Sequence, residues 1–156
     1  MKKFVSIAIL CICTLFTTAS FADNAAADDV SIPLLKEWAS EKYGCKIDSD
    51  GDLILNTTNG KTIVSVIKKA KLVRICSIYT PYEKRTRREM IDLANKFNAQ
   101  KRFLRIAIGE KNQQFCDYYV VYNGGLNSTN FMEVLDWFVN LEKSWNSFVV
   151  NNGAEE

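Results

Sequence analysis

The stretch DGDLILNTTNGKTIVSVIKKAKLVRICSIY, residues 50–79, decides the fold of this chain. It contains two hairpin signals, Asp50-Gly51 and Asn59-Gly60, whose residues suit the backbone angles of tight turns. Lys69-Ala70 marks a third reversal, and the segments between the turns are rich in the branched residues that favour strands. Three short connections in a row predict an antiparallel meander.

Six strands are expected along the chain. Four of them lie in this stretch and just before it, at residues 46–48, 52–57, 62–68 and 72–79. Two more are predicted at 103–108 and 115–122, with a polar connector at 110–114 between them.

Three helices are expected from capping residues and from apolar residues at helical spacing, at 32–43, from 81 onward, and at 130–150. Their predicted N-caps are Ser31, Thr80 and Asn130. The third helix has the strongest apolar stripe, made of Phe131, Val134, Leu135, Phe138, Leu141, Trp145 and Phe148. The order α-β-β-β-β-α-β-β-α, with hairpins between strands, predicts the α+β class: an antiparallel meander sheet with three helices packed on it.

The first 22 residues have the pattern of a cleavable export signal. Lys2 and Lys3 precede an apolar run at 4–16, and Ser20-Phe21-Ala22 forms a cleavage site before Asp23. The run is shorter than the roughly 20 residues that span a bilayer, which favours cleavage over an uncleaved anchor. We therefore expect cleavage after Ala22, no stable membrane anchor afterwards, and a periplasmic or secreted protein.

Cleavage would leave one domain of 134 residues with 18 basic and 18 acidic side chains. Its predicted parts are a flexible leader at 23–30, a single α+β domain at 31–150 and a mobile tail at 151–156. A formally neutral domain gives no electrostatic reason to expect a nucleic acid partner.

The chain contains no histidine, which argues against the Ser-His-Asp and Cys-His types of catalysis. Three cysteines follow the signal: Cys45, Cys76 and Cys116. Their spacing is wrong for a zinc site, so no metal or other cofactor is expected. Buried apolar side chains are the favoured interpretation of these cysteines, and one disulfide is the alternative.

Several short motifs, in this order, resemble those of the YbjN family. They are a first helix before Asp48-Ser49-Asp50-Gly51-Asp52, the run Asn95-Lys96-Phe97-Asn98 before a strand, and Gly124-Gly125 before the last helix. The resemblance covers Ser31 to Phe148 and implies a fold similar to that of type III secretion chaperones. It brings no established catalytic residues. The family is often described in cytoplasmic contexts, and the export signal departs from that pattern.

Five aromatic residues are candidates for a partner-binding groove: Tyr118, Tyr119, Tyr122, Trp137 and Trp145. Aromatic residues are enriched at interaction surfaces, and alternation along the strand places tyrosines on both of its faces. Core packing is the favoured alternative, because aromatic residues also dominate cores.

A basic patch is formed by Lys84, Arg85, Arg87 and Arg88, with further basic residues at Lys101, Arg102 and Arg105. A solvated helix face is the simpler interpretation, and an acidic partner or a lipid head group is the functional one. Asn95 and Asn98 are interpreted as residues that end a helix, with a family-specific ligand site as the alternative.

Asp48, Asp50 and Asp52 alternate as Ca²⁺ ligands do, but the loop lacks the glycine and glutamate positions of an EF-hand, so a hairpin turn is favoured. Taken together, the sequence features predict a non-catalytic, chaperone-like binding module of the bacterial envelope that acts on an unidentified protein partner. Whether it acts as a homodimer stays open at this point. The alternatives are a sensor of lipid or metal ions and, less favoured, a hydrolase using Asp48, Asp50, Asp52 or Asp117.

Overall fold

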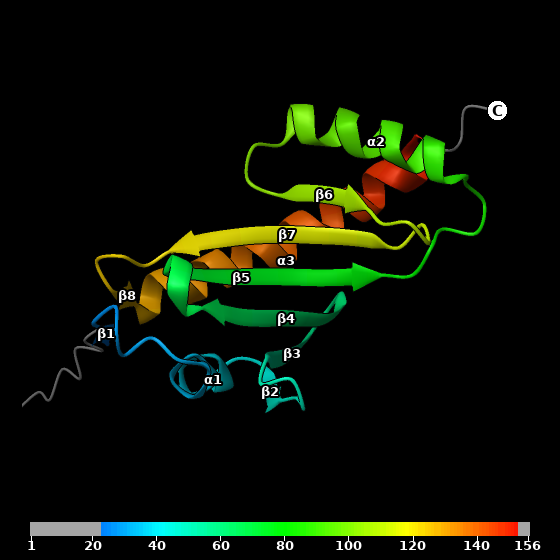
Figure 1. Cartoon of the computed structure of the whole chain (residues 1–156). Coiled ribbons are helices and arrows are strands. Elements are labelled where there is room, and N and C mark those ends of the chain that lie inside the picture. Colours follow the sequence, from blue (N-terminus) through cyan, green and yellow to red (C-terminus); the bar gives the residue numbers. More distant parts are fainter. Residues whose placement is uncertain (1–22, 153–156) are drawn as a thin grey trace, which may run out of the picture.

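The computed structural model describes residues 23–152 (Figure 1). The predicted export signal at 1–22 and the end of the predicted tail at 153–156 lie outside the described residues. No helix within 23–152 is both long and apolar enough to cross a bilayer.

A six-stranded antiparallel sheet forms the centre of the molecule, in the order β2-β3-β4-β5-β7-β6. The strands, in that order, are Gly44–Ile47, Leu53–Thr57, Gly60–Ile67, Leu72–Tyr79, Gln114–Val121 and Arg105–Ile108. The first four form the predicted meander, with turns at the predicted places, the third of them a 3₁₀ turn, η1 (Lys68–Ala70).

The last two strands are not a simple continuation of the meander. β7 lies between β5 and β6, so the connection that leaves β5 crosses over one strand position before β6 begins. The sheet remains antiparallel throughout, and the predicted α+β class is confirmed.

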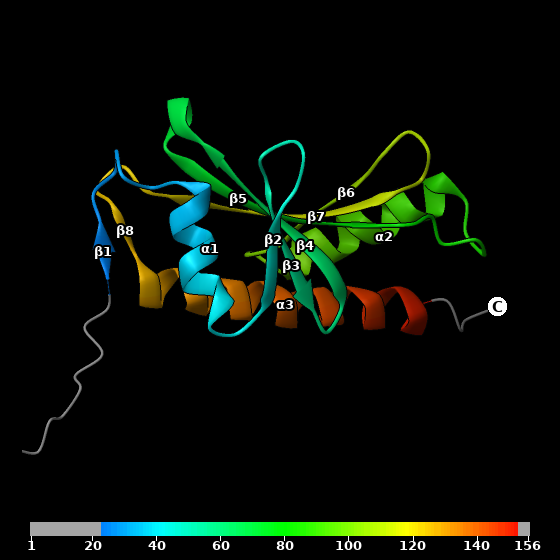
Figure 2. The ribbon, with the colours of Figure 1, turned by 90° about the horizontal axis from the view of Figure 1, so that it is seen from below.

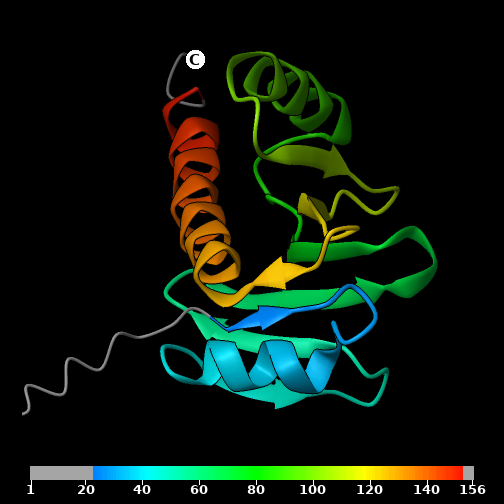
Figure 3. The same cartoon turned by 90° about the vertical axis from the view of Figure 1, so that its left-hand side faces the viewer.

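Three helices pack on the sheet: α1 (Ile32–Ser40), α2 (Arg87–Gln100) and α3 (Ser128–Asn151). α3 runs along one side of the sheet, with α1 near the β2 edge and α2 near the β6 edge (Figures 1 and 3). Among the described residues no helix covers the opposite face (Figure 2). That face presents the partly exposed side chains of Ile67, Ile78, Tyr119 and Val121.

The core lies between α3 and the sheet. Four residues of the predicted α3 stripe are buried and the other three are partly buried against the same core. Trp38 of α1 packs on Phe131 at one end of α3, and Phe97 of α2 packs edge-on against Trp145 at the other. α3 therefore joins the two outer helices through one continuous apolar core.

A small polar cluster interrupts this core. Glu142 of α3 has no exposed surface, and its Oε2 lies 3.4 Å from the amide nitrogen of Asn59 in the β3–β4 turn. Within the described chain, its other oxygen and the hydroxyl of Tyr79 have no hydrogen-bond partner. Burial raises the pKa of Glu142, and the polar groups of Ser77 and Asn59 offset only part of that rise.

Two of the three predicted helix starts were wrong. The Thr80-Pro81 segment is irregular, and α2 begins after Thr86, whose hydroxyl accepts from the N–H of Glu89 while the Glu89 carboxylate accepts from the Thr86 N–H. α3 begins earlier than expected, because the side chain of Asn127 accepts from the N–H of Asn130. Both sites carry capping chemistry that competed with the predicted caps.

The leader predicted to be flexible at 23–30 is folded in the structure. Its residues Asn24–Ala25 form strand β1, which pairs antiparallel with β8 (Leu126–Asn127) at the start of α3. Asp23 also accepts a hydrogen bond from the N–H of Ser128, and Val30 is buried. The polar sequence of the segment gave no sign of this strand, because hydrogen bonds between backbone groups require no apolar pattern.

Candidate functional site

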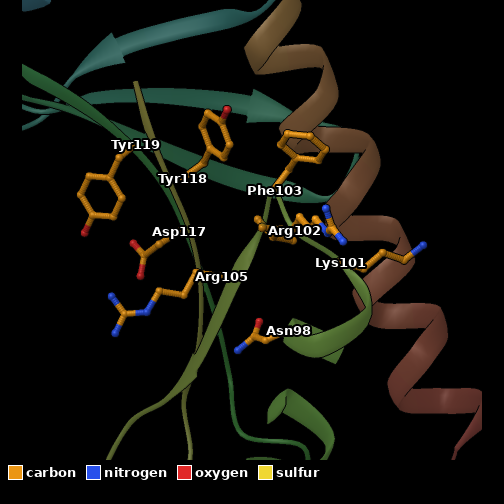
Figure 4. A pocket seen from close by; sticks show the side chains of 9 residues that line it. Asn98, Lys101, Arg102, Phe103, Arg105, Asp117, Tyr118 and Tyr119 are labelled. Atoms are coloured by element: carbon orange, nitrogen blue, oxygen red, sulfur yellow. The ribbon is translucent and has the colours of Figure 1, made fainter. Parts of the chain in front are cut away.

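The sheet has a notch where β6 is shorter than β7. The β6–β7 ladder ends at the pair Arg105–Asp117, whereas β7 continues to Val121. Before β6, the segment 101–104 leaves the sheet and turns toward α2. The resulting hollow, of about 500 Å³, is called the notch below. It is lined by Asn98, Lys101, Arg102, Phe103, Leu104, Arg105, Asp117, Tyr118 and Tyr119 (Figure 4).

Asn98 fixes the outer border of the notch. Its side-chain oxygen accepts from the N–H of Ile106 at 2.8 Å, and its amide nitrogen donates to the carbonyl of the same residue at 2.9 Å. The Asn98 side chain thus makes the two hydrogen bonds that a neighbouring strand would make. It covers the free edge of β6 at Ile106 and links α2 to β6. The prediction that Asn98 ends the helix was wrong, since α2 continues to Gln100.

An exposed aromatic pair lies next to the notch. Phe103 and Trp137 of α3 meet edge-on with ring centroids 5.8 Å apart, and 55% and 59% of their surfaces remain exposed. With Asn140 and Leu141 they line an almost wholly apolar hollow that adjoins the notch at Phe103. Large side chains that pack on each other and still face solvent are typical of contact surfaces.

Three cations line the notch beside this pair. Lys101, Arg102 and Arg105 all line the notch and are exposed. The carboxylate in the notch belongs to Asp117, which is nearly buried and accepts from Nε of Arg74 on β5 at 2.7 Å. Since Asp117 already has a cationic partner, the notch presents a net positive surface.

The five predicted aromatic residues do not form one groove. Tyr122 and Trp145 are buried in the core, where the Trp145 N–H donates to Oε1 of Gln114. Tyr118 is half-buried and faces the helices, whereas Tyr119 is exposed on the other face of β7. Tyr118 and Tyr119 therefore line the notch and Trp137 lies beside it, while the other two have structural positions.

The predicted basic patch is divided in the structure. Arg85 reaches a carbonyl near the end of α3, at Val149, and Arg87 donates to the carbonyl of Gly109 at 2.9 Å. Lys84 and Arg88 are exposed. Two of the four side chains thus bond backbone carbonyls, one near the end of α3 and one in the β6–β7 connection.

Two further motifs have structural explanations. Asp48 accepts from the N–H groups of Asp50 and Asp52, which makes the aspartate motif a hairpin turn far from Asp117 in the sheet. Residues 23–152 contain no group of three or more side chains placed to hold a metal ion. The three cysteines are free thiols, and burial raises the pKa of Cys76 to about 12.

The remaining motif residues differ in their surroundings. Asn95 is exposed on α2. Gly125 has φ +101°, and an added Cβ would lie 2.5 Å from the carbonyl oxygen of Ala25 in β1. Gly124 has open space around it. Of the two glycines, only Gly125 is needed for the close approach of β1.

Sequence reasoning missed Phe103 as a surface residue. It begins an expected strand, where an aromatic residue is ordinarily read as core. The signal that would have found it is its position beside Lys101 and Arg102, since a strand that starts with two cations is typical of a sheet edge.

Comparison with known proteins agrees with this fold. Residues 35–142 match the YbjN family model, described as "Putative bacterial sensory transduction regulator". The crystal structure of YbjN from E. coli is similar with a TM-score of 0.57 and 14% identity, over 81% of this chain and 91% of that one.

A second similar structure is the HopA1-SchA chaperone-effector complex, with a TM-score of 0.55 and 11% identity. That match covers 74% of this chain and 91% of the other. A comparison with curated proteins finds no matching relative. Because the family model spans well over half of the sequence, this chain belongs to the YbjN family.

Proposed function

We propose that this protein is an exported, non-catalytic binding module of the bacterial envelope that recognises a partner protein in a chaperone-like way. The observation that carries the proposal is the exposed pair Phe103–Trp137 beside the cationic notch. Desolvating two large aromatic side chains supplies binding energy, and the neighbouring cations add selectivity for the partner.

The non-catalytic part of the proposal rests on composition and placement. The sequence has no histidine, and the carboxylates considered for hydrolysis lie apart, in a hairpin turn and in an ion pair with Arg74. The likeness to a chaperone-effector complex supports a protein as the partner. The envelope location rests on the export signal in residues 1–22.

Location is tested first, by isolating the protein from fractionated cells of its source. The proposal expects the processed form in the envelope fraction, with Asp23 as its first residue by N-terminal sequencing. Full-length protein in the cytoplasmic fraction would contradict the envelope role and leave the binding surface to be tested separately.

Binding is tested in the same cells with a photo-crosslinking amino acid at position 137. The control carries the same group at Lys69, an exposed residue of η1 away from the notch. We expect one discrete adduct from position 137, which Phe103→Ser greatly reduces, and none from position 69. Equal adducts from both positions, or none from position 137, would rule out this surface.

A further inference from the structure

The notch exposes a length of sheet edge. β5 pairs with β7 as far as Val121, but β6 pairs with it only up to Asp117. Within residues 23–152, the half of β7 from Tyr118 to Val121 therefore has a strand on one side and none on the other. Unpaired strand edges accept an additional strand readily.

Alternation identifies the backbone groups that face the notch. The N–H of Tyr122 donates to Lys71 on the β5 side at 3.0 Å. Successive residues of an antiparallel strand direct their backbone groups to opposite sides, so Tyr119 and Val121 face away from β5. The contacts of β6 agree with this assignment. The N–H and C=O of Ile106 bond Asn98 and so point away from β7, which makes its neighbour pair, Arg105–Asp117, the one that exchanges hydrogen bonds between the strands. Asp117, with the same parity as Tyr119 and Val121, therefore faces β6.

The surroundings of this edge indicate what would pair with it. Phe103 and Tyr118 lie on the helix side of the edge, whereas Tyr119 and Arg105 lie on the other side (Figure 4). Lys101 and Arg102 complete a cationic border. A second copy of the chain would bring two such borders together, and like charges at an interface oppose association.

The geometry points to strand addition: an extended, acidic segment of the partner protein pairs with the backbone of Tyr119 and Val121. Its alternate side chains contact Phe103 on one side and Arg105 on the other. This inference rests on the proposed function and specifies how the partner is held. Main-chain hydrogen bonds provide affinity in this mode, and alternate side chains provide selectivity.

The test uses the protein from Asp23 onward and a short fluorescein-labelled peptide of alternating glutamate and valine. Its control is the same peptide with lysine in place of glutamate. We expect saturable binding of the acidic peptide by fluorescence anisotropy, weakening as salt is added, and none of the basic peptide. Amide exchange followed by NMR should show new protection at Tyr119 and Val121 but not at Val120, whose N–H has the parity of Tyr122 and faces β5.

Two proline variants make the test specific to the backbone. Val121→Pro removes a donor from the notch edge and should weaken peptide binding by about tenfold, the effect of one lost hydrogen bond. Ile47→Pro is the matched control. It lies on the edge strand β2, next to Asp48, whose N–H donates inward to Asp52, so the N–H of Ile47 faces solvent. Circular dichroism checks that both variants fold.

Distinct outcomes overturn the inference. Absence of acidic-peptide binding, equal binding of both peptides, or equal loss in both proline variants would each do so. Protection of Tyr119 and Val121 in the peptide-free protein, together with a dimeric mass, would show that a second copy fills the edge. If Val121→Pro leaves the adduct at position 137 intact, strand addition fails while the proposed binding function stands.

Discussion

At the residue scale, Glu142 is a carboxyl group in an unfavourable position. It has no exposed surface, and its Oε1 has no hydrogen-bond partner among the described residues. Because burial raises the folded-state pKa above the ordinary value of 4.5, the folded protein retains this proton more tightly than the unfolded chain does. Its contribution to stability is therefore greatest below pH 4.5 and is lost as the pH rises through the folded-state pKa.

Glu142→Gln should remove this loss, because a neutral amide occupies the same space and titrates no proton. We expect the free energy of unfolding at pH 8 to rise by about 1–3 kcal/mol, with little change at pH 4. Urea unfolding at a series of pH values between 4 and 8 measures this free energy. Glu133→Gln, on the exposed face of the same helix, is the control and should leave the pH dependence as in the wild type. Parallel pH profiles for the wild type and Glu142→Gln would contradict the assignment.

Asn98 and Asn95 offer a second matched pair on one helix. Asn98→Ala removes both side-chain hydrogen bonds to Ile106, so the N–H and C=O of Ile106 lose their partner. The expected cost is about 1–3 kcal/mol of unfolding free energy. Asn95→Ala, at an exposed position, should change it by less than about 0.5 kcal/mol. Equal effects in thermal unfolding would show that the edge-closing contact contributes nothing measurable.

At the element scale, local signals predicted most strands and only some helix ends. The turns at Asp50-Gly51 and Asn59-Gly60 were placed well because short hairpins have strong residue requirements. The start of α2 was misplaced because two adjacent segments, at Thr80 and Thr86, both carry capping chemistry. Only the long-range packing of α2 on β6 and α3 decides between them.

The β1–β8 pair depends on Gly125, which the sequence marked only as part of a motif. Gly125→Ala would place a Cβ against the Ala25 carbonyl at a strained positive φ, so β1 should detach or shift. We expect a loss of about 1–3 kcal/mol and faster proteolysis of the N-terminal segment. Gly124→Ala, with open space around it, should match the wild type in both measurements. The same proteolysis rate in both variants would argue against a pinned leader.

At the scale of the whole molecule, the sequence predicted the α+β class but neither the position of β7 nor the notch. Strand order reflects pairing between distant segments, such as Leu72 with Val121, and no local pattern records it. The notch follows from that order, because β6 ends where β7 continues. Tyr119 and Trp137, two of the predicted site residues, lie at or beside the notch. The spacing of apolar residues in the sequence could not distinguish these two exposed side chains from the buried ones of Tyr122 and Trp145.

α3 joins the whole fold through Trp145, and the two tryptophans of this helix test that role. Trp145→Phe would leave a cavity and deprive buried Gln114 of its donor, so the free energy of unfolding should fall by about 2–4 kcal/mol. Trp137→Phe changes a largely exposed ring and should alter stability by less than about 0.5 kcal/mol. Urea unfolding followed by circular dichroism at 222 nm gives both values. Because Trp145 contacts α2 and the sheet together, its variant should still unfold in one transition. Two separate transitions would show that α2 and the meander are independent units, and equal losses in both variants would show that Trp137 also belongs to the core.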